Sequence, residues 1–218
     1  MNLISAHDTA DHNLTVVERI AEELARRILD GRLSPGSRLR QEEFAFELGV
    51  SHVTVREAFR RLELQNLVES QPRRGVRVTQ LDARSEREII AMRVALEGLA
   101  LRHITGRVSR AQLQKIRAAL EDGDRAEDIM AAEAANRDFH NGLAAACAMP
   151  RLNALIAELN LAYSRYAIAN ARETPWRRRL NLDHWQIYEA YAAANYELAA
   201  TLLTGHLGSA DRVRWHRP

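Results

Sequence analysis

Four residues in the second half of the sequence have the side chains of a metal-binding site: Asn136, His140, His184 and His206. Asn136 and His140 are spaced i and i+4, so on a helix their side chains share one face and can reach one ion. Three imidazoles and an amide oxygen would surround such an ion and leave positions open for water or a ligand. The ligand set favours zinc among the divalent metals, with nickel and manganese as alternatives.

His184 and His206 can meet only if the chain reverses between them. On one continuous helix His184 and His206 would be about 33 Å apart. Midway between them, Asn195 is a suitable N-cap for a new helix that begins at Tyr196. A reversal there would bring the two histidines level. The alternative is that all three are hydrogen-bonded residues of mostly apolar helices, as we expect for His7, His12, His103 and His216.

A second group of residues, His52 to Arg77, is locally basic. It contains six arginines against the three acids Glu57, Glu63 and Glu69. Because the guanidinium group forms forked hydrogen bonds with phosphate and guanine, such a patch suits nucleic acid. The net charge of the whole chain, +2, does not indicate nucleic acid by itself.

The elements around this basic group are short helices followed by strands. Apolar residues at helical spacing predict a helix over 14–28, with a Thr15-x-x-Glu18 capping box, and the turn cluster 34–37 follows it. Two further helices are predicted at 42–48, ending at Gly49, and at 52–64, with Ser51 as N-cap. The runs 67–70 and 76–79 alternate as strands of a two-stranded hairpin.

This order predicts a winged helix-turn-helix that binds double-stranded operator DNA, with helix 52–64 in the major groove and the hairpin as the wing. The glycine at the hairpin tip permits a tight turn and close approach to the sugar-phosphate chain. Arg56 lies one turn into the recognition helix, although a surface ion pair with Glu57 or Glu63 is an alternative role for it. The predicted DNA-binding residues are Ser51, His52, Thr54, Arg56, Arg60, Arg73, Arg74 and Gly75.

The rest of the chain is helical in pattern, from a Ser85-x-x-Glu88 box onwards. The fold class is therefore mostly α, an N-terminal winged helix-turn-helix with a small β-hairpin followed by an all-α helical bundle. We expect an N-terminal tail over 1–13, a DNA-binding domain over 14–80 and an effector-binding and dimerisation domain over 81–218. Cys147 is the only cysteine, and no secretory signal or membrane-length apolar run is present, so we expect a cytoplasmic protein without membrane contact.

The N-terminal region resembles the GntR family of bacterial regulators over residues 14 to 79. The resemblance is most specific at Val55-Arg56-Glu57-Ala58 and Arg73-Arg74-Gly75-Val76. The family pattern usually has arginine where this chain has His52, and often proline where it has Thr54. A histidine cannot make the bidentate contact of arginine with guanine, so the base preference is expected to differ.

Residues 84 to 212 resemble the FCD type of effector domain in the same family. The resemblance is carried by Arg93-x-x-x-Glu97, Asn136-x-x-Phe139-His140, His184 and His206. It implies a homodimeric helical bundle in which a divalent metal and a small carboxylate bind, with Arg93 facing the cavity as an effector-binding residue. The alternative for Arg93 is a surface salt bridge with Glu97. Where this chain has Asn136 the family often has aspartate, which would hold the ion with more charge.

Taken together, these features predict a ligand-responsive transcription regulator, a repressor of a metabolic operon, and not an enzyme. Two other functions are alternatives. A metal-dependent hydrolytic enzyme would need a carboxylate beside the open coordination position, and Asp138, two residues before His140, points away from it on a helix. An architectural DNA-binding protein with a purely dimerising C-terminal domain would show no effect of ligands on DNA affinity.

Overall fold

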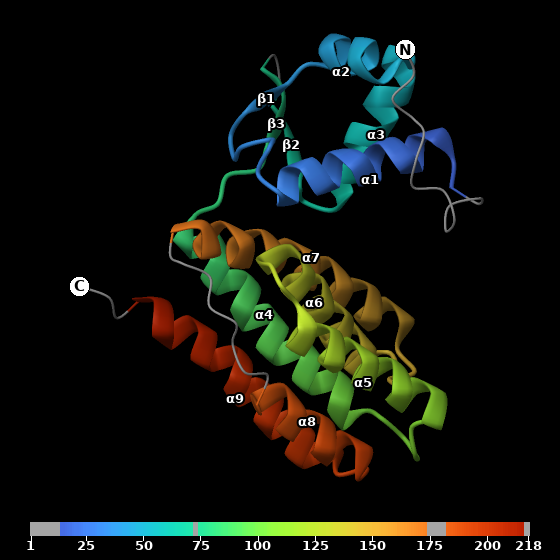
Figure 1. The fold of residues 1–218 in the computed structure, drawn as a ribbon, viewed down its shortest axis with the longest axis vertical. Helices are drawn as coiled ribbons and strands as arrows, with labels where there is room; N and C mark the ends of the chain where they lie inside the picture. The colour runs from blue at the N-terminus through green and yellow to red at the C-terminus, as the bar shows by residue number, and fades with distance from the viewer. Residues whose placement is uncertain (1–13, 72–73, 174–181, 216–218) are drawn as a thin grey trace. The chain divides into compact units, whose positions relative to one another are not determined.

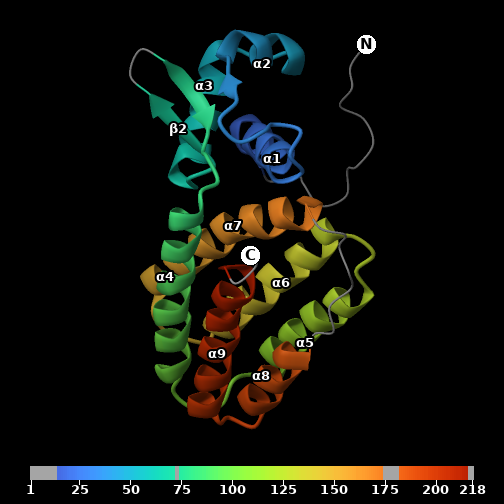
Figure 2. The ribbon, with the colours of Figure 1, turned by 90° about the vertical axis from the view of Figure 1, so that its left-hand side faces the viewer.

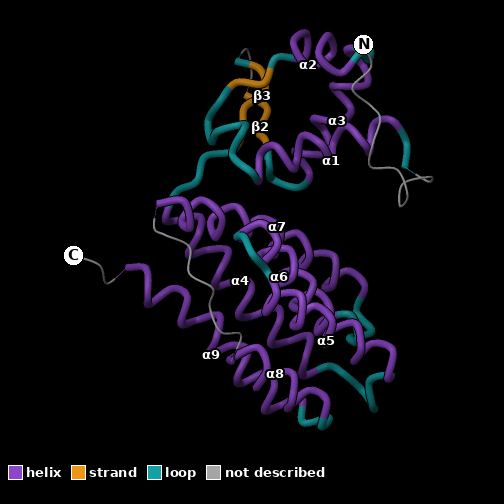
Figure 3. The backbone as a smooth tube through the Cα atoms, in the orientation of Figure 1, coloured by secondary structure: helices purple, strands orange, loops and turns teal. Residues whose placement is uncertain are grey.

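The computed structural model describes residues 14–71, 74–173 and 182–215 (Figure 1). The chain divides into two compact units, and the boundary falls between Gln80 and Leu81. Within the described residues, strands occur in the first unit and the second is built of helices and loops (Figure 3). The mostly helical fold class is therefore confirmed.

The helices of the N-terminal unit are α1 (Val16–Leu29), α2 (Gln41–Leu48) and α3 (His52–Leu64). The predicted capping box is present, because the Glu18 amide donates to Thr15 Oγ1 (3.2 Å) and the Thr15 amide donates to the Glu18 carboxylate (2.7 Å). Gly49 ends α2 in the left-handed conformation (φ +65°), which a glycine adopts without strain. The apolar face of α3 is buried and consists of Val55, Ala58, Phe59 and Leu62.

An antiparallel sheet completes this unit, with strands β1 (Arg38–Leu39), β2 (Val68–Gln71) and β3 (Gly75–Val78) in the order β1-β3-β2. The predicted hairpin is present as β2 and β3. The third strand, β1, was not predicted; Arg38 pairs with Arg77 and Leu39 with Val76. A segment of two residues has no alternation of its own, and it becomes a strand only because β3 pairs with it.

The helices of the C-terminal unit are α4 (Ala83–Arg102), α5 (Arg110–Arg125), α6 (Ile129–Ala144), α7 (Pro150–Glu173), α8 (Leu182–Ala192) and α9 (Tyr196–Trp215). Helix α4 packs against α9 on one side and α7 on another, and α6 packs between α5 and α7 (Figure 2). Their shared core includes Leu101, Leu120, Phe139, Ile187 and Leu203, all almost fully buried. This packing sets α6, α8 and α9 around the interior of the bundle.

Two helix starts in this unit test the capping predictions. The start at Ser85 is wrong, because α4 begins two residues earlier and the Asp82 carboxylate accepts from the amides of Arg84 and Ser85. Asn195 caps α9 as predicted, accepting from the Leu198 amide at 3.2 Å. Among the described residues, every helix is too short or too polar to span a lipid bilayer.

Candidate metal centre and nucleic-acid interface

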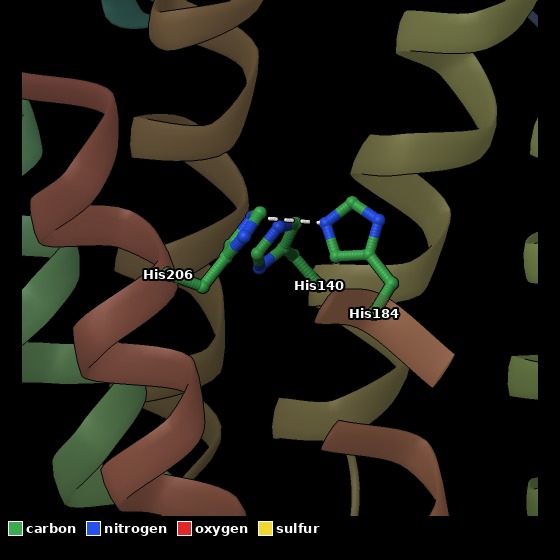
Figure 4. Close-up of side chains that lie close together, drawn as sticks. All are labelled: His140, His184 and His206. Carbon is green, nitrogen blue, oxygen red and sulfur yellow. Dashed lines mark hydrogen bonds between the residues drawn. The ribbon is translucent and has the colours of Figure 1, made fainter. Parts of the chain in front are cut away.

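The structure brings His140 of α6, His184 of α8 and His206 of α9 to one place (Figure 4). Their ligand nitrogens all lie within 4.8 Å of one another, and the Nε2 atoms of His184 and His206 are 3.0 Å apart. Two nitrogens that bind one zinc ion at about 2.0–2.1 Å and a tetrahedral angle are about 3.3 Å apart. The spacing of these donors fits a single ion, and binding by them stays a prediction.

Two carboxylates fix the orientation of two of these imidazoles. The Nδ1 atom of His140 lies 2.7 Å from Glu97 Oε2, and the Nδ1 atom of His206 lies 3.2 Å from Asp183 Oδ2. An ionised carboxylate only accepts, so each Nδ1–H donates and the Nε2 lone pair is left for another partner. This is the arrangement in which an outer carboxylate orients a metal-binding histidine and raises its basicity.

Burial keeps the three imidazoles neutral. It lowers the pKa of His140 to about 4, against the opposing effect of Glu97. Burial also lowers the pKa of His184 far below its usual value, and lowers that of His206 despite the opposing Asp183. Burial alone would raise the pKa of Glu97, but Arg93 and then His140 outweigh it and lower this pKa to about 2. At neutral pH the site therefore presents neutral imidazoles, the form that binds metal.

The metal-free protein is expected to lose stability as the pH falls from about 6.5 towards 4. The His140 pKa is about 4 in the folded chain, against roughly 6.5 when unfolded. The unfolded state therefore binds the proton first, and the stability that neutral His140 contributes above pH 6.5 is lost as the pH falls through this range. By linkage the loss is roughly 3 kcal/mol. Denaturant unfolding of chelator-treated protein at several pH values measures it.

The matched variants are His140→Gln, which should reduce this pH dependence, and His103→Ala, which should keep it. His103 is exposed and its Nδ1 lies 2.9 Å from the Leu99 carbonyl, so it has no part in the cluster. An unchanged pH dependence in the His140 variant would show that the buried imidazole is not its source.

Asn136, the predicted fourth ligand, lies one turn before His140 on α6. Its Nδ2 donates to Glu133 Oε1 at 3.1 Å. Because the amide nitrogen is used in this bond, the Asn136 side-chain oxygen is the atom that a cation would contact. Burial raises the pKa of Glu133, and Ser164 Oγ also donates to it at 3.1 Å. Coordination by Asn136 stays a prediction.

Arg93 and Glu97 form the ion pair that was the alternative role for Arg93, with Nε and Oε1 2.8 Å apart. The pair is not on the surface, however, since the two side chains are only 2% and 1% exposed. The guanidinium also lies over the Tyr163 ring of α7, 4.7 Å from its centroid. Arg93, Glu97 and His140 thus form one buried chain of contacts across α4 and α6.

Sequence reasoning missed the two orienting carboxylates. Glu97 was considered only as the partner of Arg93, because its contact with His140 joins separate helices and leaves no spacing signal. Asp183 directly precedes a predicted ligand, but its partner is His206, on the next helix. The available signal was a general one: metal-binding histidines commonly have a carboxylate partner, and Asp183 stands next to a predicted ligand in the sequence.

At the start of the predicted recognition helix α3, some polar side chains form hydrogen bonds within the protein and others are exposed to solvent. The N-cap Ser51 accepts from the Thr54 amide at 3.1 Å, and the Ser51 and Thr54 hydroxyl oxygens are 2.7 Å apart. His52 is exposed. Ser51 and Thr54 therefore use their hydroxyl groups to build the helix start, and His52 presents its ring to solvent.

Arg56 is exposed and has no hydrogen-bond or ion-pair partner among the residues that the structure describes. The alternative pairing with Glu57 or Glu63 is not formed. Glu57 accepts from Arg60 (3.0 Å), and Glu63 accepts from the Ser70 amide (2.9 Å). The guanidinium of Arg56 is thus available for DNA, whereas that of Arg60 is engaged.

The hairpin tip is described in part. Arg74 and Gly75 are exposed, and Gly75 has φ +79°, the left-handed backbone that the predicted tight turn requires. Arg73 lies outside the described residues. The roles of all these residues on DNA stay predictions.

Two protein-family models match separate parts of the chain. The model of bacterial regulatory proteins of the gntR family matches residues 16–78, and the FCD domain model matches residues 88–209. An uncharacterized HTH-type transcriptional regulator, BphR of Paraburkholderia xenovorans (strain LB400), is 32% identical over 208 residues, covering 91% of this chain and 85% of that one. A probable D-xylose utilization operon transcriptional repressor of Paenarthrobacter nicotinovorans is 31% identical over 205 residues, covering 89% and 87%.

Solved structures show the same likeness. The crystal structure of a putative transcriptional regulator GntR from Rhodococcus sp. RHA1 has a TM-score of 0.77 and 28% identity, and it covers 92% of this chain and 99% of that one. Most of the chain, with residues of both units, therefore has a counterpart in a solved structure.

Proposed function

The chain belongs to the gntR family of bacterial regulatory proteins and carries an FCD domain, and from this premise we propose that it is a DNA-binding transcription regulator whose helical unit senses a small organic acid at a divalent metal. Its domains and relatives are those of transcription regulators and not of enzymes. The observation that supports the sensing function is the convergence of three buried or half-buried imidazoles from separate helices.

His140, His184 and His206 would hold the ion, zinc first with nickel or manganese as alternatives, and Asn136 would add an amide oxygen. When bound, the ion supplies a positive centre for a carboxylate oxygen of the effector. Arg93 uses its Nε–H for Glu97, and the terminal N–H groups of its fork suit a carboxylate. The effector class that follows is a small carboxylate.

The regulator acts as a homodimer on a near-palindromic operator in the cytoplasm. Effector occupancy changes the separation of the two recognition helices, and DNA affinity changes with it. We favour repression of a metabolic operon, because a relative with 31% identity is a probable repressor of D-xylose utilization. By reciprocity, operator DNA changes effector affinity by the same factor.

The test combines native mass spectrometry of the purified protein with operator binding. The spectra report the metal content and the dimer, and titrations with a panel of small carboxylates report the change in operator affinity. We expect about one ion per chain and a change of roughly 5–150-fold for the right effector. Operator affinity that no member of the panel alters would favour the architectural alternative, in which the helical unit only dimerises.

Arg56→Ala is expected to weaken operator binding by roughly 1–3 kcal/mol if this guanidinium, which has no partner among the described residues, contacts a base edge. The matched control on the same helix is Arg60→Ala. Since Arg60 is bound to Glu57 at 3.0 Å, its loss should have the smaller effect. Fluorescence anisotropy against the operator and against shuffled DNA measures both, and circular dichroism checks the helical content. Equal losses on both DNA molecules would assign Arg56 to phosphate instead.

A further inference from the structure

Val53 is an apolar side chain left in water at the start of the predicted recognition helix. It is 55% exposed, whereas the other apolar residues of the first three turns of α3 are nearly fully buried. It is the second residue of α3, in the turn whose side chains reach base edges in helix-turn-helix proteins. Because Val53 is not part of the buried face of α3, the packing of the N-terminal unit does not explain why an apolar residue stands at this position.

Two of the polar side chains beside Val53, Ser51 and Thr54, are already engaged with each other. The Thr54 and Ser51 hydroxyl oxygens lie 2.7 Å apart and bond to each other. In the first two turns of the helix, His52, Val53 and Arg56 are the exposed side chains. Of these three only Val53 cannot form a hydrogen bond, so any base contact that it makes must be apolar.

We propose that Val53 contacts the 5-methyl group of a thymine in each operator half-site and makes that thymine the preferred base. The thymine methyl is the apolar group that base pairs present in the major groove. Valine is stiff at χ1, so it holds its two methyl groups in place without losing rotamer freedom on binding. The contact removes apolar surface of both partners from water. This inference rests on the proposed placement of α3 in the major groove.

The experiment removes the methyl from the DNA and the side chain from the protein in turn. DNA of high affinity is selected from a random pool with the wild-type protein, and each thymine is then replaced singly by deoxyuridine, which lacks the 5-methyl group. At one position per half-site, affinity for the wild type should fall by about fourfold, the factor that corresponds to one buried methyl group. Val53→Ala should bind the thymine and deoxyuridine versions of that site with nearly equal affinity.

Leu64→Ala is the matched control, because Leu64 is 76% exposed at the far end of the same helix. This variant should keep the full deoxyuridine effect. The inference is overturned if no deoxyuridine weakens the wild type, or if Val53→Ala retains the same loss at the same position. If Arg56→Ala weakens binding while the methyl has no effect, only this inference fails. If neither variant alters DNA binding, the placement of α3 fails with it.

Discussion

Replacing His140 with alanine is expected to abolish specific metal binding and with it the stabilisation that metal gives the helical unit. His140 is 1% exposed, is held by Glu97, and is one of the three described histidines whose nitrogens come together, so its loss leaves only two of these imidazoles. A ligand that binds only the native state at 1,000 times its dissociation constant stabilises by about 4.1 kcal/mol. Wild type should therefore melt higher with added zinc than with chelator, and His140→Ala should melt at the same temperature in both.

His184→Ala and His206→Ala should behave in the same way, whereas His103→Ala should keep the full response to zinc. Elemental analysis of protein purified without chelator gives an independent measure of the bound ion. The prediction of a metal centre is wrong if two results are found together. Protein purified in this way carries no ion, and added zinc, nickel or manganese leaves the wild-type melting temperature unchanged. The histidines would then be buried core residues, and the effector would have to be bound by Arg93 and hydrogen bonds.

Local signals in the sequence predicted the parts of this fold that depend on neighbouring residues. The Thr15–Glu18 capping box, the Asn195 cap and the buried face of α3 are all set within one or two helical turns. Helix α4 was the exception, because Asp82 and Ser85 both suit an N-cap and only the path of the chain decides between them. Strand β1 was not predicted, because its pairing with β3 joins residues far apart in sequence.

The same distinction applies to the candidate sites. His184 and His206 could be paired from the sequence because a single reversal, at Asn195, brings them together. Grouping His140 with them depended largely on the resemblance to the FCD domain. The contact of Glu97 with His140 depends on how α4 packs against α6, and no periodicity records such packing. In α3, likewise, the sequence left the partner of Arg56 open, since both Glu57 and Glu63 lie within reach on a helix.

Glu97→Gln is expected to destabilise the helical unit by about 3–5 kcal/mol, because it removes the charge of the ion-pair partner of the buried Arg93. The lowered pKa of Glu97 also indicates that its ionised form stabilises the folded chain. The pKa of this carboxylate lies at about 2, below its ordinary value of 4.5, so ionised Glu97 contributes about 3 kcal/mol above pH 4.5 that is lost as the pH falls towards 2. Urea unfolding measures the change in free energy.

The chain offers a matched control in Arg117 and Glu121 of α5. This pair has the same i,i+4 spacing and a similar distance, 2.9 Å, but its side chains are 61% and 40% exposed. Because water screens an exposed pair, Glu121→Gln should cost about 0.5 kcal/mol or less. A comparable loss in both variants would mean that burial of the Arg93–Glu97 pair is not what makes it important.

Glu97 is also expected to position His140 for the metal, and a double variant separates this role from stability. Arg93→Met with Glu97→Leu replaces the whole buried pair by apolar side chains, which often restores stability. It also removes the acceptor 2.7 Å from His140 Nδ1, and loss of such an orienting partner typically weakens metal binding by about 10–100-fold. The double variant should therefore be more stable than Glu97→Gln and still bind zinc weakly in competition with a chelator. Zinc binding restored together with stability would show that Glu97 only balances the charge of Arg93.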